Sequence, residues 1–267
     1  MRFRYGVSFF CALDVIGVDY NQCTGYFSNL TMITKPMKKS LLILTLSLGA
    51  LVACHRTNYT MMAPAWEPDY SLNRFEREIE AFEAADAKNM PPKGGTVFTG
   101  SSSFRLWFNV QKDLNAPIIN RGFGGSTLPD VIHYLDRTVL KYEPATLVVY
   151  CENDQFGAKY KSPEQTRDAY VELTRRVREK LPKVEMYFVS LKPSPSRWDR
   201  REEVMKTNRL IREFVDSDRH HNYIDVWPVM MKDGRPDGSI FIKDSLHMNA
   251  EGYRRWTQVF KPIVGKP

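Results

Sequence analysis

Cysteine is scarce in this chain, with four residues among 267, at positions 11, 23, 54 and 151. So few cysteines exclude a small fold built on a dense set of disulfide bonds. The remaining composition is that of an ordinary globular protein, with 43% hydrophobic, 12% aromatic and 26% charged residues. The sequence can therefore build a full hydrophobic core, and its length suits one large domain or two small ones.

A concentrated run of positive charge is also lacking, although the formal net charge is +7. Residues 1–53 contribute +3 of this charge, which leaves +4 for residues 54–267. In the larger part the basic residues are interleaved with acids, as in Arg200-Arg201-Glu202-Glu203. This pattern is typical of solvated helix faces, so we expect no nucleic acid among the partners of the chain.

No hydrophobic run is long enough to span a membrane, since the run within residues 37–54 has only about a dozen apolar residues. Two lysines precede this run and small residues lead from it to Cys54, which is the order typical of a secretory signal. The segment Leu51-Val52-Ala53-Cys54 also resembles the bacterial lipobox, in which the cysteine is lipidated and becomes the new N-terminus. A buried helix or strand is the alternative interpretation of the same run.

A signal peptide normally begins at the N-terminus, yet 36 residues precede Met37. We therefore expect Met37 to be the native start, and we expect lipid on Cys54 to anchor an exported protein to the membrane of the bacterial cell envelope. The anchored chain would retain only Cys54 and Cys151, which cannot form a disulfide framework. The expected segments are a non-native upstream extension (1–36), a lipoprotein signal peptide (37–53), a tether (54–70) and one folded domain (71–267).

Beyond the tether, hydrophobic patterning predicts a helix over 72–89 and then a regular alternation of strands and helices. The predicted strands cover 96–99, 116–120, 146–150, 184–191 and 223–226. The predicted helices that follow them cover 103–114, 127–142, 163–181, 200–216 and 250–260. Five strands alternating with helices indicate an α/β fold of three α/β/α layers, in which one five-stranded parallel sheet is covered on both faces.

Residues suited to chemistry follow four of the five predicted strands. They are Gly100-Ser101-Ser102 after the first strand, Gly124-Gly125 after the second, Asn153 after the third and Asp244-Ser245-Leu246-His247 after the fifth. In an open parallel sheet the carboxyl ends of the strands share one edge, where ligands bind. Each segment alone has an ordinary interpretation, since serines form turns or N-caps and Asp-x-x-His can be a helix cap with a surface histidine. Their combination at one edge favours a site for acyl transfer.

Ser102 is the candidate nucleophile of this site. A serine hydroxyl needs a base within hydrogen-bond reach, and His247 can accept and return a proton near neutral pH. Asp244, three residues earlier, can orient the imidazole and stabilise its charged form. The backbone N–H groups of Ser102 and Gly125 and the side-chain amide of Asn153 are candidate donors to an oxyanion. The glycine run could instead bind phosphate, but it lacks the Gly-x-Gly-x-x-Gly spacing and a following Lys-Ser/Thr.

These segments resemble the sequence blocks of the SGNH (GDSL-type) hydrolases, and the resemblance spans about 96–260. Gly100-Ser101-Ser102 is similar to the first block, with Ser101 where aspartate is common. Residues 120–125 resemble the second block, with Gly125 as its oxyanion glycine. Glu152-Asn153-Asp154 resembles the third, with Asn153 as its oxyanion asparagine. Asp244-Ser245-Leu246-His247 resembles the last block, and Asn249-x-x-Gly252-Tyr253 continues it.

The resemblance implies a flavodoxin-like fold and a serine esterase or acylhydrolase that needs neither a metal nor a cofactor. It implies small acyl esters as substrates, acetyl esters above all, and an envelope location favours esters of carbohydrates or cell-envelope glycans. Two other kinds of protein stay open. One is a thioesterase, lysophospholipase-like acylhydrolase or acyltransferase, and the other is a non-catalytic glycan-binding lipoprotein. The natural ester and the oligomeric state are not indicated by the sequence.

Cys151 departs from the family pattern, because glycine usually stands at this position of the third block. It could act as a nucleophile, yet free cysteine is among the most buried residue types, which favours a small core residue. Phe104, Trp107 and Phe108 also have two interpretations. They could line an acyl or sugar site beside Ser102, although an aromatic run after a strand is more often part of the core.

Overall fold

The computed structural model describes residues 73–156 and 160–264. The expected upstream extension, signal peptide and tether, with the predicted lipidation site Cys54, lie outside these residues. Within the two described ranges, no helix is long and apolar enough to cross a membrane.

Five parallel strands form the central sheet, in the order β2-β1-β3-β4-β5. They are β1 (Thr96–Gly100), β2 (Ile118–Gly122), β3 (Thr146–Tyr150), β4 (Glu185–Val189) and β5 (His221–Ile224). This is the flavodoxin-like order, whose switch point lies between β1 and β3. Gly100 at the end of β1 pairs with Gly122 of β2 and with Tyr150 of β3, so these three strands end side by side. The predicted five-stranded parallel sheet is confirmed.

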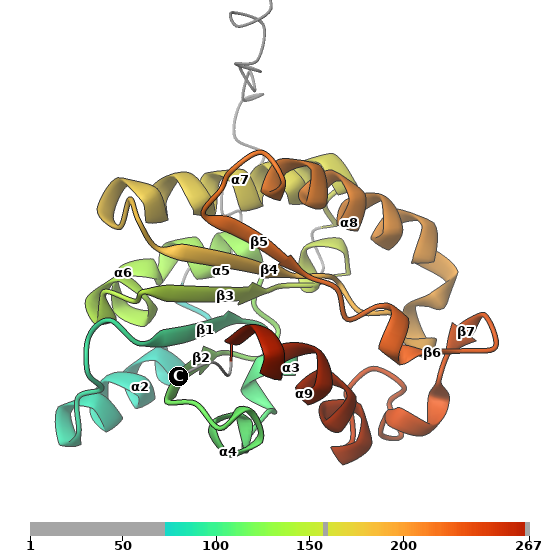
Figure 1. Cartoon of the computed structure of the whole chain (residues 1–267), viewed down its shortest axis with the longest axis horizontal. Coiled ribbons are helices and arrows are strands. Elements are labelled where there is room, and N and C mark those ends of the chain that lie inside the picture. The colour runs from blue at the N-terminus through green and yellow to red at the C-terminus, as the bar shows by residue number, and fades with distance from the viewer. Residues whose placement is uncertain (1–72, 157–159, 265–267) are drawn as a thin grey trace, which may run out of the picture. The chain divides into compact units, whose positions relative to one another are not determined.

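Helices cover both faces of the sheet, which gives the predicted three layers (Figure 1). One face packs against α2 (Glu76–Lys88), α5 (Leu128–His133), α6 (Leu135–Thr138), α7 (Pro163–Lys180) and α8 (Arg201–Val215). The other face carries α3 (Ser102–Arg105), α4 (Val110–Leu114) and α9 (Ala250–Val264). Successive strand residues point to opposite faces, so Leu147 belongs to the first core and Val148 to the second.

An aromatic cluster supports α3, the helix that begins at Ser102. The Phe104 ring lies 4.8 Å from that of Phe98 and 5.8 Å from that of Tyr150, and all three are fully buried. Trp256 and Phe260 of α9 complete the cluster, with their rings stacked at 5.6 Å. Aromatic pairs contribute about 0.5–1.5 kcal/mol each beyond the burial of their area. The position of α3 is therefore set by packing against β1, β3 and α9.

Two predicted helices are interrupted in the structure. The segment 103–114 forms α3 and α4, which are separated at residues 106–109. Trp107 is buried in this break, whereas the Phe108 side chain points outward and is 82% exposed. The segment 127–142 is likewise divided into α5, α6 and a 3-10 turn at Leu140–Tyr142. Apolar spacing thus predicts where these helical segments lie, but it does not reveal the breaks within them.

A small hairpin stands where the sequence predicts only a polar stretch. Its strands β6 (Met231–Lys232) and β7 (Arg235–Pro236) pair antiparallel across Asp233-Gly234. Asp-Gly is a strong signal for a two-residue hairpin turn, so the turn could have been found. The strands could not, because two residues are too few to show an alternating pattern.

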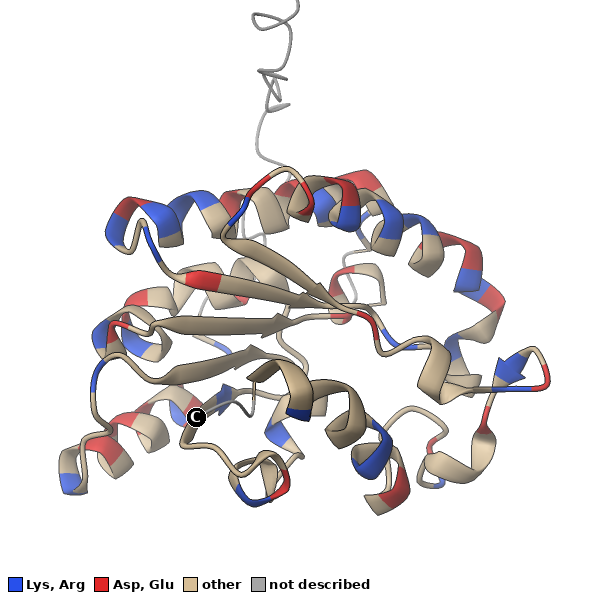
Figure 2. Ribbon diagram, viewed as in Figure 1, with Lys and Arg blue, Asp and Glu red and all other residues tan. Residues whose placement is uncertain are grey.

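Basic and acidic side chains are interspersed over the outer helices (Figure 2). On α7, Arg175 pairs with Glu179, and both side chains are about half exposed. At the end of α8, Arg212 pairs with Asp216. Exposed pairs of this kind contribute about 0–1 kcal/mol each, so they identify solvated helix faces and are a minor source of stability.

Candidate active site

Ser102 follows a point where the backbones of β1 and β3 come into close contact. Gly100 ends β1 with φ +126°, and a Cβ at this residue would lie 1.9 Å from the carbonyl oxygen of Tyr150. A residue with a side chain cannot occupy this position unless a strand moves. The N–H of Ser101 donates to the same oxygen at 2.8 Å, and α3 begins at the next residue. Ser101 and Ser103 are buried, so of the three serines Ser102 is the one that reaches the surface.

Three of the predicted site residues form one hydrogen-bonded chain. His247 Nε2 lies 3.0 Å from Ser102 Oγ, although 145 positions separate the two residues in the sequence. His247 Nδ1 lies 2.6 Å from Asp244 Oδ2. If Nδ1 carries the proton, Nε2 is free to accept one from the serine hydroxyl, which is the arrangement a general base requires.

Hydrogen bonds within its own loop keep the Asp244 carboxyl ionised. Partial burial raises its pKa, but the hydrogen bond with the His247 side chain acts in the opposite direction. Asp244 Oδ1 also accepts the backbone N–H groups of Leu246 and His247, each at 2.9 Å. Together these bonds outweigh the effect of burial and lower the pKa of Asp244 to about 2. The histidine therefore faces a permanent negative charge at neutral pH.

The loop that carries Asp244 and His247 is held to its surroundings by backbone hydrogen bonds. The N–H of Ser196, in the loop after β4, donates to the carbonyl of Ser245 at 3.1 Å. The N–H of Ile242 donates to the carbonyl of His247 at 2.9 Å. Because these bonds fix the backbone at Ser245 and His247, within the Asp-x-x-His segment, the two side chains are oriented before any substrate binds.

The two predicted oxyanion residues lie in adjacent loops after β2 and β3. The Asn153 side-chain Nδ2 donates to the carbonyl of Ser126 at 3.2 Å, which joins the two loops next to Gly125. A Cβ at Gly125 would meet no atom within 4 Å, so space is open in front of its backbone. Within the described part of the chain, the N–H groups of Gly125 and Ser102 make no hydrogen bond and remain available as donors.

Arg197, which no sequence pattern singles out, connects the predicted oxyanion asparagine, Asn153, to a buried carboxylate. Its Nη2 donates to Asn153 Oδ1 at 3.2 Å, and its Nη1 lies 3.2 Å from Glu152 Oε2. The guanidinium also lies over the Phe156 ring at 4.1 Å. The only signal in the sequence was an arginine in the proline-rich loop after the fourth predicted strand, and nothing there indicated its partners.

A fully buried ion pair lies next to Asn153. Lys192 Nζ lies 2.5 Å from Glu152 Oε1, and neither side chain is more than 2% exposed. Burial raises the pKa of Glu152, but the charges of Lys192 and Arg197 outweigh this effect and lower it overall. Burial also lowers the pKa of Lys192, against the opposing effect of Glu152. An unpaired charge at such depth is strongly destabilising, so this pair maintains the structure of the third loop.

Cys151 lies in the core, as its residue type predicts. It is 0% exposed, and burial followed by the nearby Asp154 and Asp130 carboxylates raises the pKa of its thiol well above the usual value. The thiol is therefore protonated at neutral pH. A protonated, inaccessible thiol is not a nucleophile, which excludes the alternative role considered for Cys151.

The structure corrects the weak assignment of Phe104 and Trp107 to substrate binding. Phe104 is 0% exposed and Trp107 is 1% exposed, because both side chains fill the core beneath α3 and α9. Trp107 Nε1 is satisfied internally by Asp113 Oδ2 at 2.8 Å. The accessible aromatic residue of this segment is instead Phe108.

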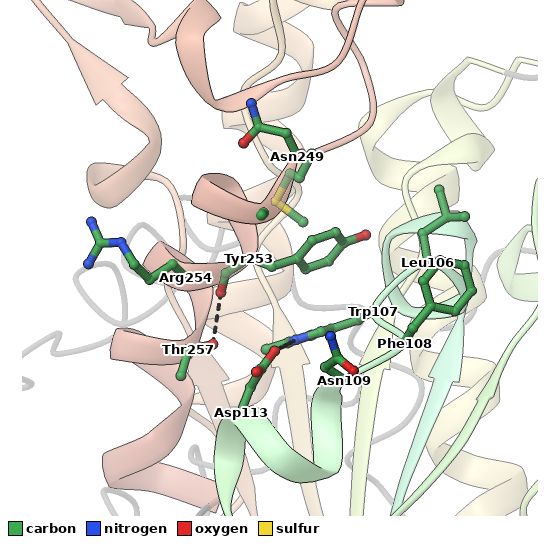
Figure 3. A pocket seen from close by; sticks show the side chains of 11 residues that line it. Leu106, Trp107, Phe108, Asn109, Asp113, Asn249, Tyr253, Arg254 and Thr257 are labelled. Atoms are coloured by element: carbon green, nitrogen blue, oxygen red, sulfur yellow. Dashed lines mark hydrogen bonds between the residues drawn. The ribbon is translucent and has the colours of Figure 1, made fainter.

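A pocket opens between the segment that joins α3 to α4 and the first turns of α9 (Figure 3). It has a volume of about 460 Å³. Leu106 and Met248 are among its lining residues. Leu106 donates its N–H to the carbonyl of Ser102 at 2.9 Å, and Met248 directly follows His247. Ser102 and His247 themselves are not among its lining residues.

In the described residues, no group of three or more His, Cys, Asp or Glu side chains is arranged to hold a metal ion. The acidic groups at the site are engaged elsewhere, Asp244 with His247 and Glu152 with Lys192.

Comparison with known proteins identifies related sequences and folds. The model of the GDSL-like lipase/acylhydrolase family matches residues 94–255, which include all five predicted site residues from Ser102 to His247. None of the curated protein sequences compared with the chain is significantly similar to it.

Solved structures share the fold at low sequence identity. A GDSL-like lipase from Bacteroides thetaiotaomicron is 18% identical with a TM-score of 0.59, over 73% of this chain and 98% of that one. An acetylxylan esterase from Geobacillus stearothermophilus is 12% identical with a TM-score of 0.54, over 66% of this chain and 97% of that one. At these identities the likeness establishes a common fold.

Proposed function

The chain belongs to the GDSL-like lipase/acylhydrolase family, and we propose that it is a serine esterase that acts through Ser102, His247 and Asp244. Membership of this family makes the chain a hydrolase. The observation that carries the proposal is the continuous chain of hydrogen bonds from Asp244 through His247 to the Ser102 hydroxyl. This arrangement supplies the nucleophile, the base and the group that orients the base.

The first half of the reaction forms an acyl-enzyme. Ser102 Oγ attacks the ester carbonyl carbon while His247 Nε2 takes the hydroxyl proton. The carbonyl oxygen becomes negatively charged and accepts hydrogen bonds from the N–H groups of Ser102 and Gly125 and from the Asn153 amide. When the tetrahedral intermediate collapses, its C–O bond to the alcohol breaks and His247 returns the proton to the departing alcohol.

The second half of the reaction uses the same groups on water. His247 takes a proton from a water molecule, which attacks the acyl carbon attached to Ser102. The oxyanion forms again against the same three donors, and collapse releases the free acid while His247 reprotonates the serine. Asp244 stabilises the imidazolium in both halves without accepting a proton itself, in keeping with its pKa of about 2.

Small acyl esters, acetyl esters above all, are the proposed substrates. The fold shared with an acetylxylan esterase supports this choice, as does the expected location of the chain among envelope glycans. We further propose that the protein is exported and attached to the bacterial cell envelope by lipid on Cys54, because the sequence before this residue has the order of a lipoprotein signal.

A fluorophosphonate probe tests serine catalysis directly. The purified protein should be labelled on Ser102 and should hydrolyse p-nitrophenyl acetate. Ser102→Ala should lose both properties. If this variant hydrolyses p-nitrophenyl acetate as fast as the wild-type protein, Ser102 is not the nucleophile and the proposal is wrong.

A further inference from the structure

The pocket between the α3–α4 segment and α9 has a lining that selects one kind of ligand. Its volume of about 460 Å³ lies within the range of about 300–1,000 Å³ found for small-molecule sites. Figure 3 shows the Tyr253 ring extending from α9 toward the segment that carries Leu106 and Phe108. The Tyr253 ring lies 5.5 Å from that of the buried Trp107 at a tilt of 33°, so Tyr253 provides an aromatic side of the pocket that packs on the core.

Polar groups on the α4 side of this pocket have unused hydrogen-bonding capacity. The side-chain amide of Asn109 is exposed and makes no hydrogen bond to any described residue. Asp113 uses one carboxylate oxygen to accept from Trp107 Nε1, and in the described structure its other oxygen makes no hydrogen bond. One amide and one carboxylate oxygen are therefore free to bind hydroxyl groups of a ligand.

The same lining disfavours other ligand classes. A fatty acyl chain needs continuous apolar walls, which the Asn109 and Asp113 side chains interrupt. A phosphate or another anion would meet the Asp113 carboxylate, while Arg254, the basic residue at the pocket, is paired with Glu251. In Figure 3 the Arg254 side chain points away from the other labelled residues. The ligand that fits is neutral, carries several hydroxyl groups and has an apolar face.

Phe108 provides a surface for such a face. Its side chain is 82% exposed and lines the pocket, although the preceding Trp107 is buried. A large aromatic ring left in water gains free energy when a ligand covers it, at roughly 25 cal/mol per Å² of apolar area. The flat C–H face of a sugar ring has the size and polarity to cover this ring, while the sugar hydroxyls reach Asn109 and Asp113.

We propose that this pocket is a carbohydrate subsite, in which Phe108 stacks on a neutral sugar unit and Asn109 and Asp113 bind its hydroxyls. The inference rests on the proposed esterase function in one respect. It assigns the alcohol part of the ester to a glycan. The catalytic chemistry and the carbohydrate contact are separate, so each can be tested without the other.

The test measures binding of oligosaccharides that carry no ester. Xylotetraose and the N-acetylglucosamine tetramer are titrated into the purified protein, and the dissociation constant is measured by calorimetry. At least one of the two should bind, and Phe108→Ala should weaken that binding by about tenfold or more. Met90→Ala is the matched control, because Met90 is also exposed, at 56%, and does not line this pocket. It should leave the affinity unchanged.

Three results would overturn the proposal. The first is that neither oligosaccharide binds, and the second is that Phe108→Ala binds as well as the wild-type protein. The third is that a short-chain lysolipid binds in a Phe108-dependent way while the sugars do not. Hydrolysis of p-nitrophenyl acetate reports separately on the esterase. Met90→Ala should retain it, and Ser102→Ala should lose it while keeping the affinity for the oligosaccharide.

Discussion

Arg197 Nη2 donates a hydrogen bond to Asn153 Oδ1 at 3.2 Å, and this bond fixes the orientation of the Asn153 side-chain amide. With its oxygen engaged by Arg197, Asn153 must present Nδ2 on the opposite side, where it contacts the carbonyl of Ser126. Arg197 is held in turn by the buried Glu152 carboxylate. We therefore expect the arginine to be a positioning residue for Asn153, the proposed oxyanion donor.

Loss of this positioning should lower the rate without weakening substrate binding. Asn153→Ala should reduce kcat by about 10²–10³, the usual cost of one oxyanion donor. Arg197→Met should reduce kcat by about tenfold with KM nearly unchanged, because the effect falls on the transition state. In the Asn153→Ala background, Arg197→Met should cause no further decrease in kcat.

Arg201→Met is the matched control for this pair, because Arg201 is 42% exposed and belongs to the same loop–helix junction. It should leave kcat unchanged. If Arg197→Met lowers kcat by the same factor with and without Asn153, the arginine acts on the fold or the substrate and not through the asparagine.

The three consecutive serines should differ sharply in their importance. Ser102→Ala should lower kcat for p-nitrophenyl acetate by at least about 10⁴-fold, as in other triads that lose the nucleophile. Ser103→Ala should retain both activity and thermal stability, because the buried Ser103 hydroxyl has no hydrogen-bond partner among the described residues. Kinetics and the melting temperature of both variants check this contrast, and a Ser103→Ala variant without activity would contradict it.

The ionised Asp244 carboxyl should contribute to stability over a defined range of pH. Its pKa is about 2 in the folded protein and about 3.9 in an unfolded chain. Its contribution is therefore complete above about pH 4 and is lost as the pH falls through about 2. Urea unfolding between these values should show a steeper loss of stability in the wild-type protein than in Asp244→Asn. Parallel curves for the two proteins would contradict the assigned pKa.

Gly100→Ala should destabilise the fold, because its Cβ would lie 1.9 Å from the Tyr150 carbonyl oxygen at a φ of +126°. Backbone strain of about 1–3 kcal/mol and overpacking of similar size predict a loss of about 2–6 kcal/mol. Gly238→Ala is the control, since a Cβ there meets nothing within 4 Å. Denaturant unfolding measures both, and equal stabilities would show that β1 and β3 can separate at little cost.

Lipid attachment at Cys54 is tested in cells. Radiolabelled palmitate should be incorporated into the wild-type protein and not into Cys54→Ala, because only the cysteine of a lipobox accepts the lipid. Globomycin should cause accumulation of the uncleaved form. A wild-type protein that carries no label would exclude the proposed anchor.

Much of the fold was visible in the sequence because its signals are local. Strand β3 is a continuous apolar run at Thr146–Tyr150 and has the predicted bounds. The Ser102, Asn153 and His247 segments could be grouped because strand ends of a parallel sheet share one edge. This grouping follows from the order of strands and helices along the chain, so it can be made without atomic coordinates.

The parts that could not be predicted depend on partners far apart in the chain. Glu152 and Lys192 are separated by 40 positions, and Arg197 lies 44 positions from Asn153. Neither separation matches a short-range sequence pattern, such as the three- or four-residue spacing of side chains on one face of a helix. Phe104 and Phe108 are equally aromatic in the sequence, yet one is 0% and the other 82% exposed. Phe104 belongs to α3, whereas Phe108 lies in the break between α3 and α4, and tertiary packing produces that break.

The contact between Gly100 and the carbonyl oxygen of Tyr150 bears on how this scaffold can diversify. Only main-chain atoms meet there, so the backbone just before Ser102, the proposed nucleophile, is fixed against the neighbouring strand. Loops at the carboxyl edge of the sheet can be lengthened, shortened or exchanged while the contact between β1 and β3 is retained. The same chemical step can then serve many different alcohols and acids, and new specificities can arise without rebuilding the centre of the reaction.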